Sequence, residues 1–339
     1  MNAHPDRSTS ERRRAAADTI LAGRPRRPAV MEAEAWASAN IALVKYWGKR
    51  DEALHLPVTG SLSVSMGTLG TRTSVKPALR DVIIFNGEAL PPDHPRAVRV
   101  VRYLDLFRSS EAPGFEVKTT NTLPTAAGLA SSASGFAALA RALDRMMGWN
   151  LPASALSALA RLGSGSACRS VLDGFVEWAR GARDDGKDSW AVPLSETWPG
   201  LCIGVRMVES GPKVVSSSEA MRHTVATSPL YAAWPALVER DLAEARAAIG
   251  ARDLDRLGRT AEGNALAMHA TMAAARPAVI YWTAATIGTL HNVFECRRNG
   301  IPVYATMDAG PNVKLIFEST HADAIRAAFP GVEIICPFD

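Results

Sequence analysis

Apolar residues recur along the chain with two different spacings, which predict alternating strands and helices. Bulky apolar residues, glycine turns and a period-two run at 61–65 predict strands within residues 34–75. Residues 82–85 followed by Asn86-Gly87 predict a strand that enters a hairpin turn. Further strands are predicted at 114–120, 175–178, 201–208, 302–307, 313–317 and 332–336. Helical spacing predicts helices at 91–110, 152–162, 231–250, 254–274 and 277–299.

One further helix begins inside a loop of small residues at 121–135. Phe136, Leu139, Leu143 and Met146 lie three, four and three residues apart, which is one apolar stripe of a helix that runs to about residue 147. The first turn of a helix has free N–H groups and partial positive charge, so this loop is suited to bind phosphate. An ordinary serine-capped helix is the alternative. The loop is neither a Walker A loop nor a GxGxxG dinucleotide motif.

Length and composition favour a globular protein with a well-buried core. The chain has 339 residues, 47% of them hydrophobic, and we expect a domain boundary near residue 200. No apolar run approaches the roughly 18 residues that a membrane helix needs, and no secretory leader is visible. We therefore expect a cytoplasmic protein that binds no membrane. The four cysteines form no CxxC pair and the histidines no HxxxH pair, so reduced thiols are expected and zinc is not.

The net charge of +4 lies entirely in the first 30 residues. These hold seven arginines against three acidic residues, whereas the remaining 309 residues carry 31 basic and 31 acidic side chains. The folded part therefore offers no basic surface for nucleic acid. We expect residues 1–30 to form a disordered, arginine-rich leader; an organellar transit peptide is the weaker alternative because acidic residues are unusual in one.

Two polar clusters lie within otherwise apolar or small-residue stretches. Residues 40–50 place Asn40, Tyr46 and two lysines in a strand-like segment, so Lys45 or Lys49 would suit an anionic, phosphorylated substrate. An edge strand with solvated lysines is the alternative. Arg169 follows a Gly/Ser loop and could bind a carboxylate or phosphate through two parallel hydrogen bonds. It could equally be a structural arginine bound to loop carbonyls.

Asp308 ends a predicted strand directly before Ala309-Gly-Pro-Asn312. A carboxylate held there could take or orient a hydroxyl proton, although an Asx turn is an equally ordinary reading. Ser216 and Ser217 are more typical of a helix N-cap than of a site. No GxSxG elbow is present, which argues against hydrolase chemistry.

Taken together, four segments resemble the diphosphomevalonate decarboxylase family of the GHMP kinase superfamily. The matching stretches are 40–50 with 61–64, 121–135, 163–178 with 215–217, and 307–312, and the resemblance covers about residues 34–320. It implies an α/β fold: an N-terminal domain like the second domain of ribosomal protein S5 over 31–200, and a C-terminal ferredoxin-like α+β domain over 201–339. It also implies ATP-dependent decarboxylation of mevalonate 5-diphosphate to isopentenyl diphosphate, with ATP and Mg²⁺, in a homodimer.

The resemblance also implies roles for individual residues. Catalysis would rest on Asp308, which orients or deprotonates the C3 hydroxyl, with Arg169 and Lys49. The substrate would be bound by Asn40, Tyr46, Lys49, Ser164, Ser166, Arg169, Ser217 and Met221. ATP phosphates would be bound by Pro124, Gly128, Leu129, Ala130, Ser131, Ser132 and Ala133, with the metal on Ser132.

Departures from the family pattern keep other functions open. Ser218 stands where some bacterial members have an arginine near the diphosphate, so a decarboxylase of the 5-monophosphate or a mevalonate-type 3-kinase is an alternative. A non-catalytic binding protein that contacts RNA through the leader is a third hypothesis, against which the intact polar set argues.

Overall fold

The computed structural model describes residues 7–108, 114–122, 131–208 and 215–339. The N-terminal domain is built on a sheet whose strands run in the order β6-β5-β7-β4-β8-β9, with β1 paired to β4. These strands are β1 (Ala33–Val44), β4 (Ser61–Ala78), β5 (Val82–Phe85), β6 (Glu88–Ala89), β7 (Gly114–Asn121), β8 (Phe175–Trp178) and β9 (Ala191–Pro193). All pairs are antiparallel except β5 with β7. The predicted hairpin at Asn86-Gly87 is confirmed because β5 pairs with β6 across it.

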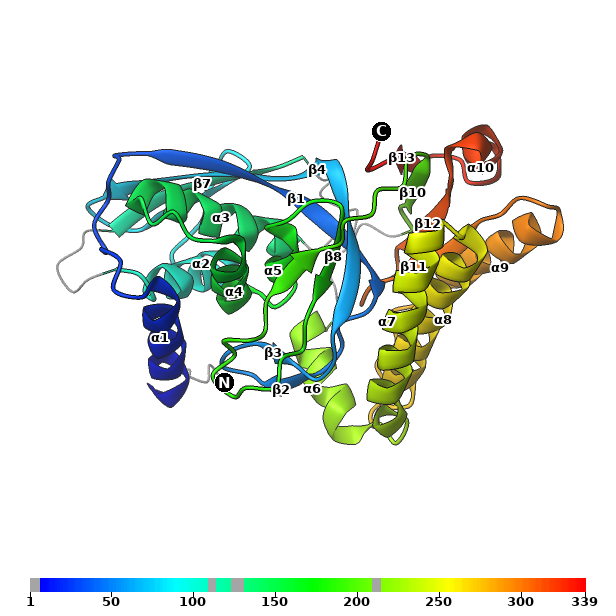
Figure 1. Ribbon diagram of the computed structural model, residues 1–339, viewed down its shortest axis with the longest axis horizontal. Helices are drawn as coiled ribbons and strands as arrows, with labels where there is room; N and C mark the ends of the chain where they lie inside the picture. The colour runs from blue at the N-terminus through cyan, green and yellow to red at the C-terminus, as the bar shows by residue number, and fades with distance from the viewer. Residues whose placement is uncertain (1–6, 109–113, 123–130, 209–214) are drawn as a thin grey trace.

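Four helices belong to the same domain as this sheet, and one of them packs directly on it. They are α2 (Pro95–Leu104), α3 (Ser131–Met147), α4 (Ala153–Gly163) and the short α5 (Ala167–Ser170). α3 packs on β1 and β4, and α4 and α5 pack on α3 (Figure 1). The predicted stripe of α3 is confirmed: Phe136, Leu139, Leu143 and Met146 are all buried. A small hairpin of β2 (Lys49–Asp51) and β3 (Leu56–Pro57) extends from the end of β1.

The C-terminal domain is a four-stranded antiparallel sheet with helices on it. Its strands are β10 (Leu201–Arg206), β11 (Tyr304–Met307), β12 (Val313–Glu318) and β13 (Glu333–Ile335), in the order β11-β12-β10-β13. Its helices are α6 (Ser217–Thr227), α7 (Trp234–Ala251), α8 (Leu254–Ala273), α9 (Ala284–Arg298) and α10 (Ala322–Ala328), with single 3-10 turns at Tyr231–Ala233 and Ser319–His321. The predicted two-domain α/β class is confirmed. In the part of the chain that is described, no helix is long and apolar enough to cross a bilayer.

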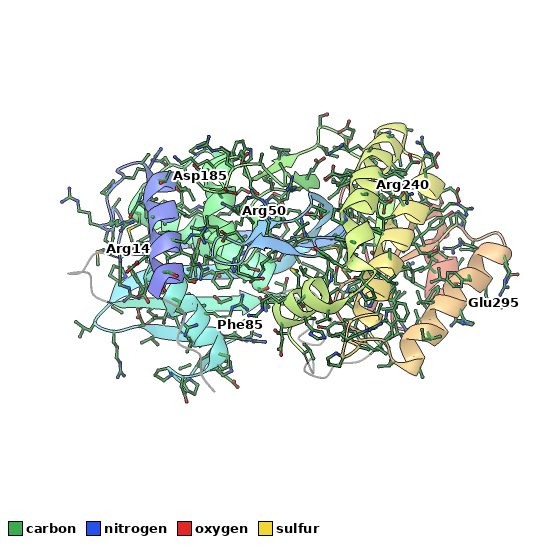
Figure 2. The ribbon with its side chains drawn as sticks, turned by 90° about the horizontal axis from the view of Figure 1, so that it is seen from below. Arg14, Arg50, Phe85, Asp185, Arg240 and Glu295 are labelled. Carbon is green, nitrogen blue, oxygen red and sulfur yellow. A yellow bond between two sulfur atoms is a disulfide. The ribbon has the colours of Figure 1, made fainter. Side chains whose placement is uncertain are left out.

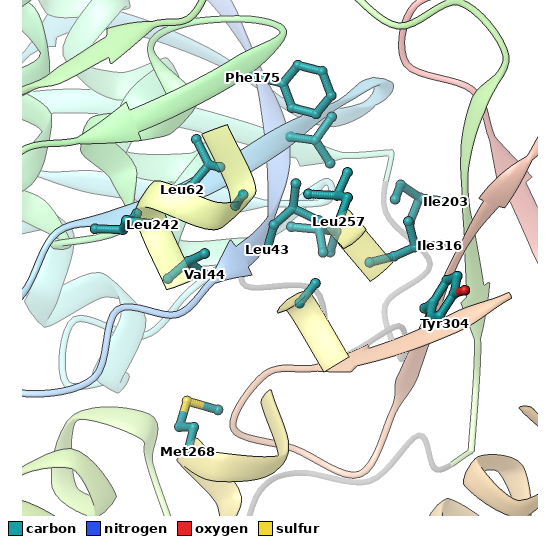
Figure 3. Close-up of a cluster of buried hydrophobic side chains, with 14 of the residues drawn as sticks. Leu43, Val44, Leu62, Phe175, Ile203, Leu242, Leu257, Met268, Tyr304 and Ile316 are labelled. Atoms are coloured by element: carbon teal, nitrogen blue, oxygen red, sulfur yellow. The ribbon is translucent and has the colours of Figure 1, made fainter. Parts of the chain in front are cut away.

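A single hydrophobic cluster joins the two domains. Leu43, Leu62 and Phe175 of the N-terminal sheet belong to the same buried cluster as Ile203 and Tyr304 of the C-terminal sheet, and α8 lies among them (Figure 3). Because this shared core is closely packed, side chains that the two domains contribute to one site have fixed relative positions.

Three expectations are corrected. Residues 7–21 of the leader are not disordered but form α1 (Arg7–Leu21), because Ala17 and Leu21 are buried in the N-terminal core. The helix predicted at 277–299 begins only at Ala284, because Thr283 and Thr286 form a capping box there.

The third correction concerns the cysteines. Cys202 and Cys336 form a disulfide, because the antiparallel pairing of Ile203 with Ile335 brings the two Cα atoms to 4.1 Å. Cys168 and Cys296 are free and buried, as expected.

Candidate active site

A cavity of about 260 Å³ lies where the two domains meet. The N-terminal domain lines it with the end of β1, the segment leading into β2, the start of α3 and the loop before α5, and the C-terminal domain with α6, α8 and the turn after β11. The residues predicted from the sequence that line it are Asn40, Tyr46, Lys49, Ser132, Ala133, Ser164, Ser166, Arg169, Ser217, Met221 and Asp308. The structure thus gathers residues from four distant segments, while the roles assigned to each remain predictions.

Asp308 lies between two buried lysines. Its Oδ1 is 3.0 Å from Lys45 Nζ, and its Oδ2 is 3.3 Å from Lys314 Nζ. Both lysine side chains are 2% exposed, whereas that of Asp308 is 28% exposed and reaches the cavity. The carboxylate therefore forms ion pairs with two ammonium groups rather than hydrogen bonds to the backbone of an Asx turn. Lys45 comes from the N-terminal domain, so this ion cluster also links the two domains.

The cluster shifts the pKa of two of its groups. Burial alone would raise the pKa of Asp308, but the charges and hydrogen bonds of Lys45 and Lys314 together outweigh it and hold that pKa well below its usual range. Burial lowers the pKa of Lys45 to about 8, with Asp308 opposing the shift. At neutral pH the carboxylate is therefore ionised and a weak base, and two adjacent cations leave an excess positive charge in the cavity.

Arg169 is held by side chains rather than by loop carbonyls. Its Nη1 donates to Ser61 Oγ and its Nη2 donates to Asn40 Oδ1 at 3.2 Å. Asn40 in turn donates to Ser170 Oγ at 2.7 Å. Arg169 is 3% exposed, and among the described residues its Nε has no hydrogen-bond partner. The result is a rigid cation at the cavity wall whose Nε–H is unpaired among the described residues.

Tyr46 offers a second unpaired donor. Its hydroxyl is buried and has no partner among the described residues, while its ring packs edge-on against Trp178 at 4.7 Å. Burial raises the pKa of Tyr46, so the phenol stays protonated and can donate. A Cβ at Gly165 would lie 2.8 Å from this hydroxyl, so the glycine is required for the close approach.

Lys49 and Ser216 each contact a residue three positions further along the chain. Lys49 Nζ lies 2.7 Å from a carboxylate oxygen of Glu52, so Lys45, weighed as the alternative to Lys49, is the lysine that contacts Asp308. Ser216 is the N-cap of α6 and accepts from Glu219 N at 3.2 Å, which confirms the capping interpretation, and it also lines the cavity.

Two contributors were missed by sequence reasoning. Lys314 lies in the apolar run of β12, and a charged residue at that position was the available signal. His269 of α8 has its Nε2 3.1 Å from the Asp308 carbonyl oxygen. Burial lowers the pKa of His269 to about 4, so the ring is neutral and Nε2–H can donate to that carbonyl. This contact fixes the backbone that carries Asp308.

The start of α3 fits a polyphosphate. Ser132 and Ala133 in its first turn line the cavity, and Ser132 Oγ is 3.5 Å from Ser164 Oγ. Ser131 is the first residue of α3, while Pro124, Gly128, Leu129 and Ala130 lie outside the described residues. A smaller hollow of about 110 Å³ adjoins the cavity through Ser132 and Arg99 and has mainly apolar walls. Hydroxyl donors, a helix N-terminus and nearby cations form a set that suits phosphate oxygens and a magnesium ion that keeps most of its water ligands.

The α3 start, the loop before α5 and the cationic cavity between two α/β domains define a GHMP-kinase-like fold. The family model for the diphosphomevalonate decarboxylase-like N-terminal domain matches residues 37–191, and that for the mevalonate 5-diphosphate decarboxylase C-terminal domain matches residues 203–332. The chain belongs to the diphosphomevalonate decarboxylase family.

Individual relatives can be aligned with this chain along most of their length. Diphosphomevalonate decarboxylase of Bos taurus is 38% identical over 321 residues, which cover 87% of this chain and 80% of the relative. A structure of MDDEF in complex with MVAPP, AMPPCP and magnesium aligns with a TM-score of 0.86 at 39% identity, covering 91% of this chain and 98% of the other. Mevalonate diphosphate decarboxylase from Staphylococcus aureus aligns with a TM-score of 0.85 at 38% identity, covering 90% and 95%.

Proposed function

We propose that this chain catalyses the ATP-dependent decarboxylation of mevalonate 5-diphosphate to isopentenyl diphosphate, ADP, phosphate and carbon dioxide. The observation that carries the proposal is Asp308 held between Lys45 and Lys314 in a cavity that also presents Arg169. Relatives named for this reaction, at 37–38% identity over most of the chain, support it.

In the first step the C3 hydroxyl of the substrate attacks the γ-phosphoryl group of ATP. Asp308 accepts the hydrogen bond of this hydroxyl and aims its oxygen. Its low pKa makes it a weak proton acceptor, so orientation and charge placement are its main contributions. As the C3 oxygen bonds to the γ-phosphorus, the bond from that phosphorus to ADP breaks and the hydroxyl proton passes to an oxygen of the transferred phosphoryl group. Lys45 stabilises the negative charge that develops on the transferred group.

The nucleotide lies with its phosphates at the start of α3. The free N–H groups there and the Ser132 hydroxyl donate to phosphate oxygens. Ser132 would hold Mg²⁺, which would supply charge neutralisation during the transfer. The smaller hollow beside Ser132 and Arg99 has the apolar walls that a purine base requires.

In the second step the phosphate at C3 leaves and the carboxylate is lost. As the C3–O bond breaks with its electron pair, positive charge develops at C3. The electrons of the C1–C2 bond then form the C2–C3 double bond and release carbon dioxide. Arg169 orients the carboxylate through its unpaired donor, while Tyr46 and Ser164 donate to the diphosphate.

An assay of three substrates tests this function. Purified protein with ATP and Mg²⁺ is given mevalonate, its 5-phosphate or its 5-diphosphate, and the release of ADP and of carbon dioxide is followed together. We expect kcat/KM to be highest for the diphosphate by at least about tenfold, since a second phosphate adds charge-assisted hydrogen bonds. No turnover of any compound would refute the proposal and favour the non-catalytic hypothesis.

One observation favours a second candidate, a decarboxylase of the 5-monophosphate. Ser218 lines the cavity where an arginine would add a cation for the terminal phosphate, and Lys49 is already paired with Glu52. A preference for the 5-phosphate in the same assay would select this candidate. Release of ADP without carbon dioxide would instead indicate a 3-kinase.

We also propose that the protein is a homodimer in the cytoplasm. The resemblance to the family supports the dimer, and the sequence composition supports the location. Light scattering on the purified protein tests the dimer: a mass near twice 36.2 kDa is expected, and a monomer mass would refute it.

A further inference from the structure

The helix α1 lies outside the region that the family models match, because the N-terminal match begins at residue 37. It packs against α4 at the edge of the N-terminal domain (Figure 1). Ala17 is fully buried and Leu21 is 2% exposed, while Ala16 and Ile20 pack against the same cluster. Burial of this apolar side anchors the helix, so its polar side chains are held in defined positions.

Two adjacent arginines of α1 extend to elements that line the cavity. Arg13 Nη2 donates to the carbonyl oxygen of Leu162, in the last turn of α4. Arg12 forms an ion pair with Asp51, at the end of β2. Leu162 lies two residues before Ser164, and Asp51 lies two residues after Lys49; both Ser164 and Lys49 line the cavity.

The contact of Arg13 is made where a helix has unsatisfied groups. The last carbonyls of a helix lack partners within it and carry partial negative charge, so a guanidinium there is favourable. The preceding carbonyl, that of Arg161, contacts His55 Nδ1 at 2.9 Å from the β2–β3 hairpin. Consecutive carbonyls at the end of α4 are thus held from two sides, and the loop that carries Ser164, Ser166 and Arg169 begins there.

The contact of Arg12 supports the hairpin in the same way. Asp51 is 15% exposed, and its Oδ1 accepts the N–H of Leu54 at 2.8 Å, which closes the turn of the β2–β3 hairpin. That hairpin carries Lys49 and His55, both at the cavity. Arg12 therefore fixes the carboxylate around which the turn is built.

We propose that α1 is a positioning element for the phosphate-binding side of the cavity, with Arg13 acting through Leu162 on the Ser164–Arg169 loop and Arg12 acting through Asp51 on Lys49. This inference rests on the proposed function for the identity of the substrate. Since Ser164 donates to the diphosphate in the proposed mechanism and takes no part in the phosphoryl transfer, loss of the contacts should raise the KM for mevalonate 5-diphosphate more than it lowers kcat.

Arg14 provides a matched control on the same helix. It donates to the carbonyl oxygens of Asp105 and Arg108 at 3.4 and 3.0 Å, so it also joins α1 to backbone carbonyls, but neither of these residues lines the cavity. Figure 2 shows Arg14 on α1 at the outer edge of the domain. A variant at this position reports what loss of an α1 contact does to stability alone.

The test compares Arg13→Met, Arg13→Lys, Arg12→Met and Arg14→Met in the full chain. KM for mevalonate 5-diphosphate and for ATP, kcat and Tm are measured for each. Arg13→Met should raise the KM for the diphosphate about five- to tenfold and leave the KM for ATP within about twofold. Arg12→Met should have a smaller effect in the same direction, because this ion pair is partly exposed. Arg13→Lys should recover most of the affinity, because an ammonium can donate to the same carbonyl, and Arg14→Met should not change either KM.

Equal KM values for Arg13→Met and Arg14→Met, with or without a lower Tm, would overturn the proposal and leave α1 a structural element only. Calorimetric titration with inorganic pyrophosphate separates this result from failure of the proposed function. If the native protein turns over no mevalonate compound but binds pyrophosphate about fivefold more weakly after Arg13→Met alone, the positioning role stands and the substrate assignment fails. Absence of any such difference overturns the positioning role whatever the substrate is.

Discussion

In the proposed mechanism, the chemistry depends most on Asp308. Asp308 directly follows β11 of the C-terminal domain. One of its carboxylate oxygens contacts Lys45 of the N-terminal domain and the other contacts Lys314 of its own domain. A carboxylate in this setting stays ionised and is fixed in direction, which supports the proposed role of orienting a hydroxyl and keeping two cations at the site of phosphoryl transfer.

Asp308→Asn should lower kcat about 10²–10³-fold, because the amide keeps the shape but loses the charge that aligns the hydroxyl and the two ammonium groups. The KM for ATP should change little, since we propose that the nucleotide binds at the start of α3. Steady-state ADP release measures both. Asp173→Asn is the matched control: this carboxylate accepts from Ser38 Oγ at 3.0 Å and lies outside the cavity, so activity should be retained. An Asp308→Asn variant with more than about a tenth of native activity would contradict the assigned role.

The pKa of Lys45 predicts how kcat/KM depends on pH. Its pKa in the folded protein is about 8, so the ammonium form is present below that pH and is lost as the pH rises through it. We expect kcat/KM to fall on the alkaline side with an apparent pKa near 8. The fall in kcat should come at higher pH, because bound phosphates favour the charged lysine. In Lys45→Arg the side chain stays charged, so the alkaline fall in kcat/KM should move to higher pH even if the maximum rate drops. A profile that stays flat to pH 10 would show that the charge of Lys45 is not needed.

Sequence patterns identified some site residues and not others. Asp308, Arg169 and Tyr46 lie in local motifs whose polarity contrasts with their surroundings, so they could be singled out. Lys314 stands out as a charge in an apolar run, but its relation to Asp308 follows only from the pairing of β11 with β12, in which Met307 pairs with Val313 and Thr306 with Lys314. Lys45 and Lys49 could not be separated by sequence, since only the tertiary structure shows which of them faces Asp308.

At the level of elements, α8 connects the shared core to the site. It carries His269, which contacts the Asp308 carbonyl, and Asn264, whose Oδ1 accepts the N–H of Lys45 at 2.8 Å. Its packing against β11 depends on Gly258, where a Cβ would lie 2.1 Å from ring atoms of Tyr304. The distance between α8 and the strand that delivers Asp308 is therefore set by a glycine.

Gly258→Ala should destabilise the protein by about 1–3 kcal/mol, because the buried Tyr304 ring cannot move aside freely. Gly263→Ala on the same helix is the control: a Cβ there meets nothing within 4 Å, so the higher helix propensity of alanine should stabilise by up to about 1 kcal/mol. Chemical denaturation of both variants measures the free energy of unfolding. Equal effects of the two substitutions would show that close packing at Gly258 does not matter.

Most elements could be predicted, and the exceptions have a physical cause. The strands and helices with clear periodicity, such as β5 and α3, are present within a few residues of the predicted bounds. Disorder is the expectation for the leader because it is rich in arginine and alanine and contains Pro25 and Pro28. Its helix depends on partners that are distant in sequence, namely Asp51 and the Leu162 carbonyl, and local composition does not reveal them.

For the whole molecule, two domains share one core and contribute opposite walls of one cavity. Tertiary pairing determines features that no local pattern predicts, including the disulfide between Cys202 and Cys336, which are 134 residues apart. The same arrangement unites Arg169 and Lys45 of the first domain with Asp308 and Lys314 of the second. We propose that this assembly both phosphorylates C3 and releases carbon dioxide from the same substrate molecule.

The most direct test follows ADP and carbon dioxide together during turnover of carboxyl-labelled mevalonate 5-diphosphate. We expect one carbon dioxide for each ADP at all times, and parallel loss of both products in Asp308→Asn. Release of ADP without carbon dioxide, or of carbon dioxide that persists undiminished in Asp308→Asn, would contradict it.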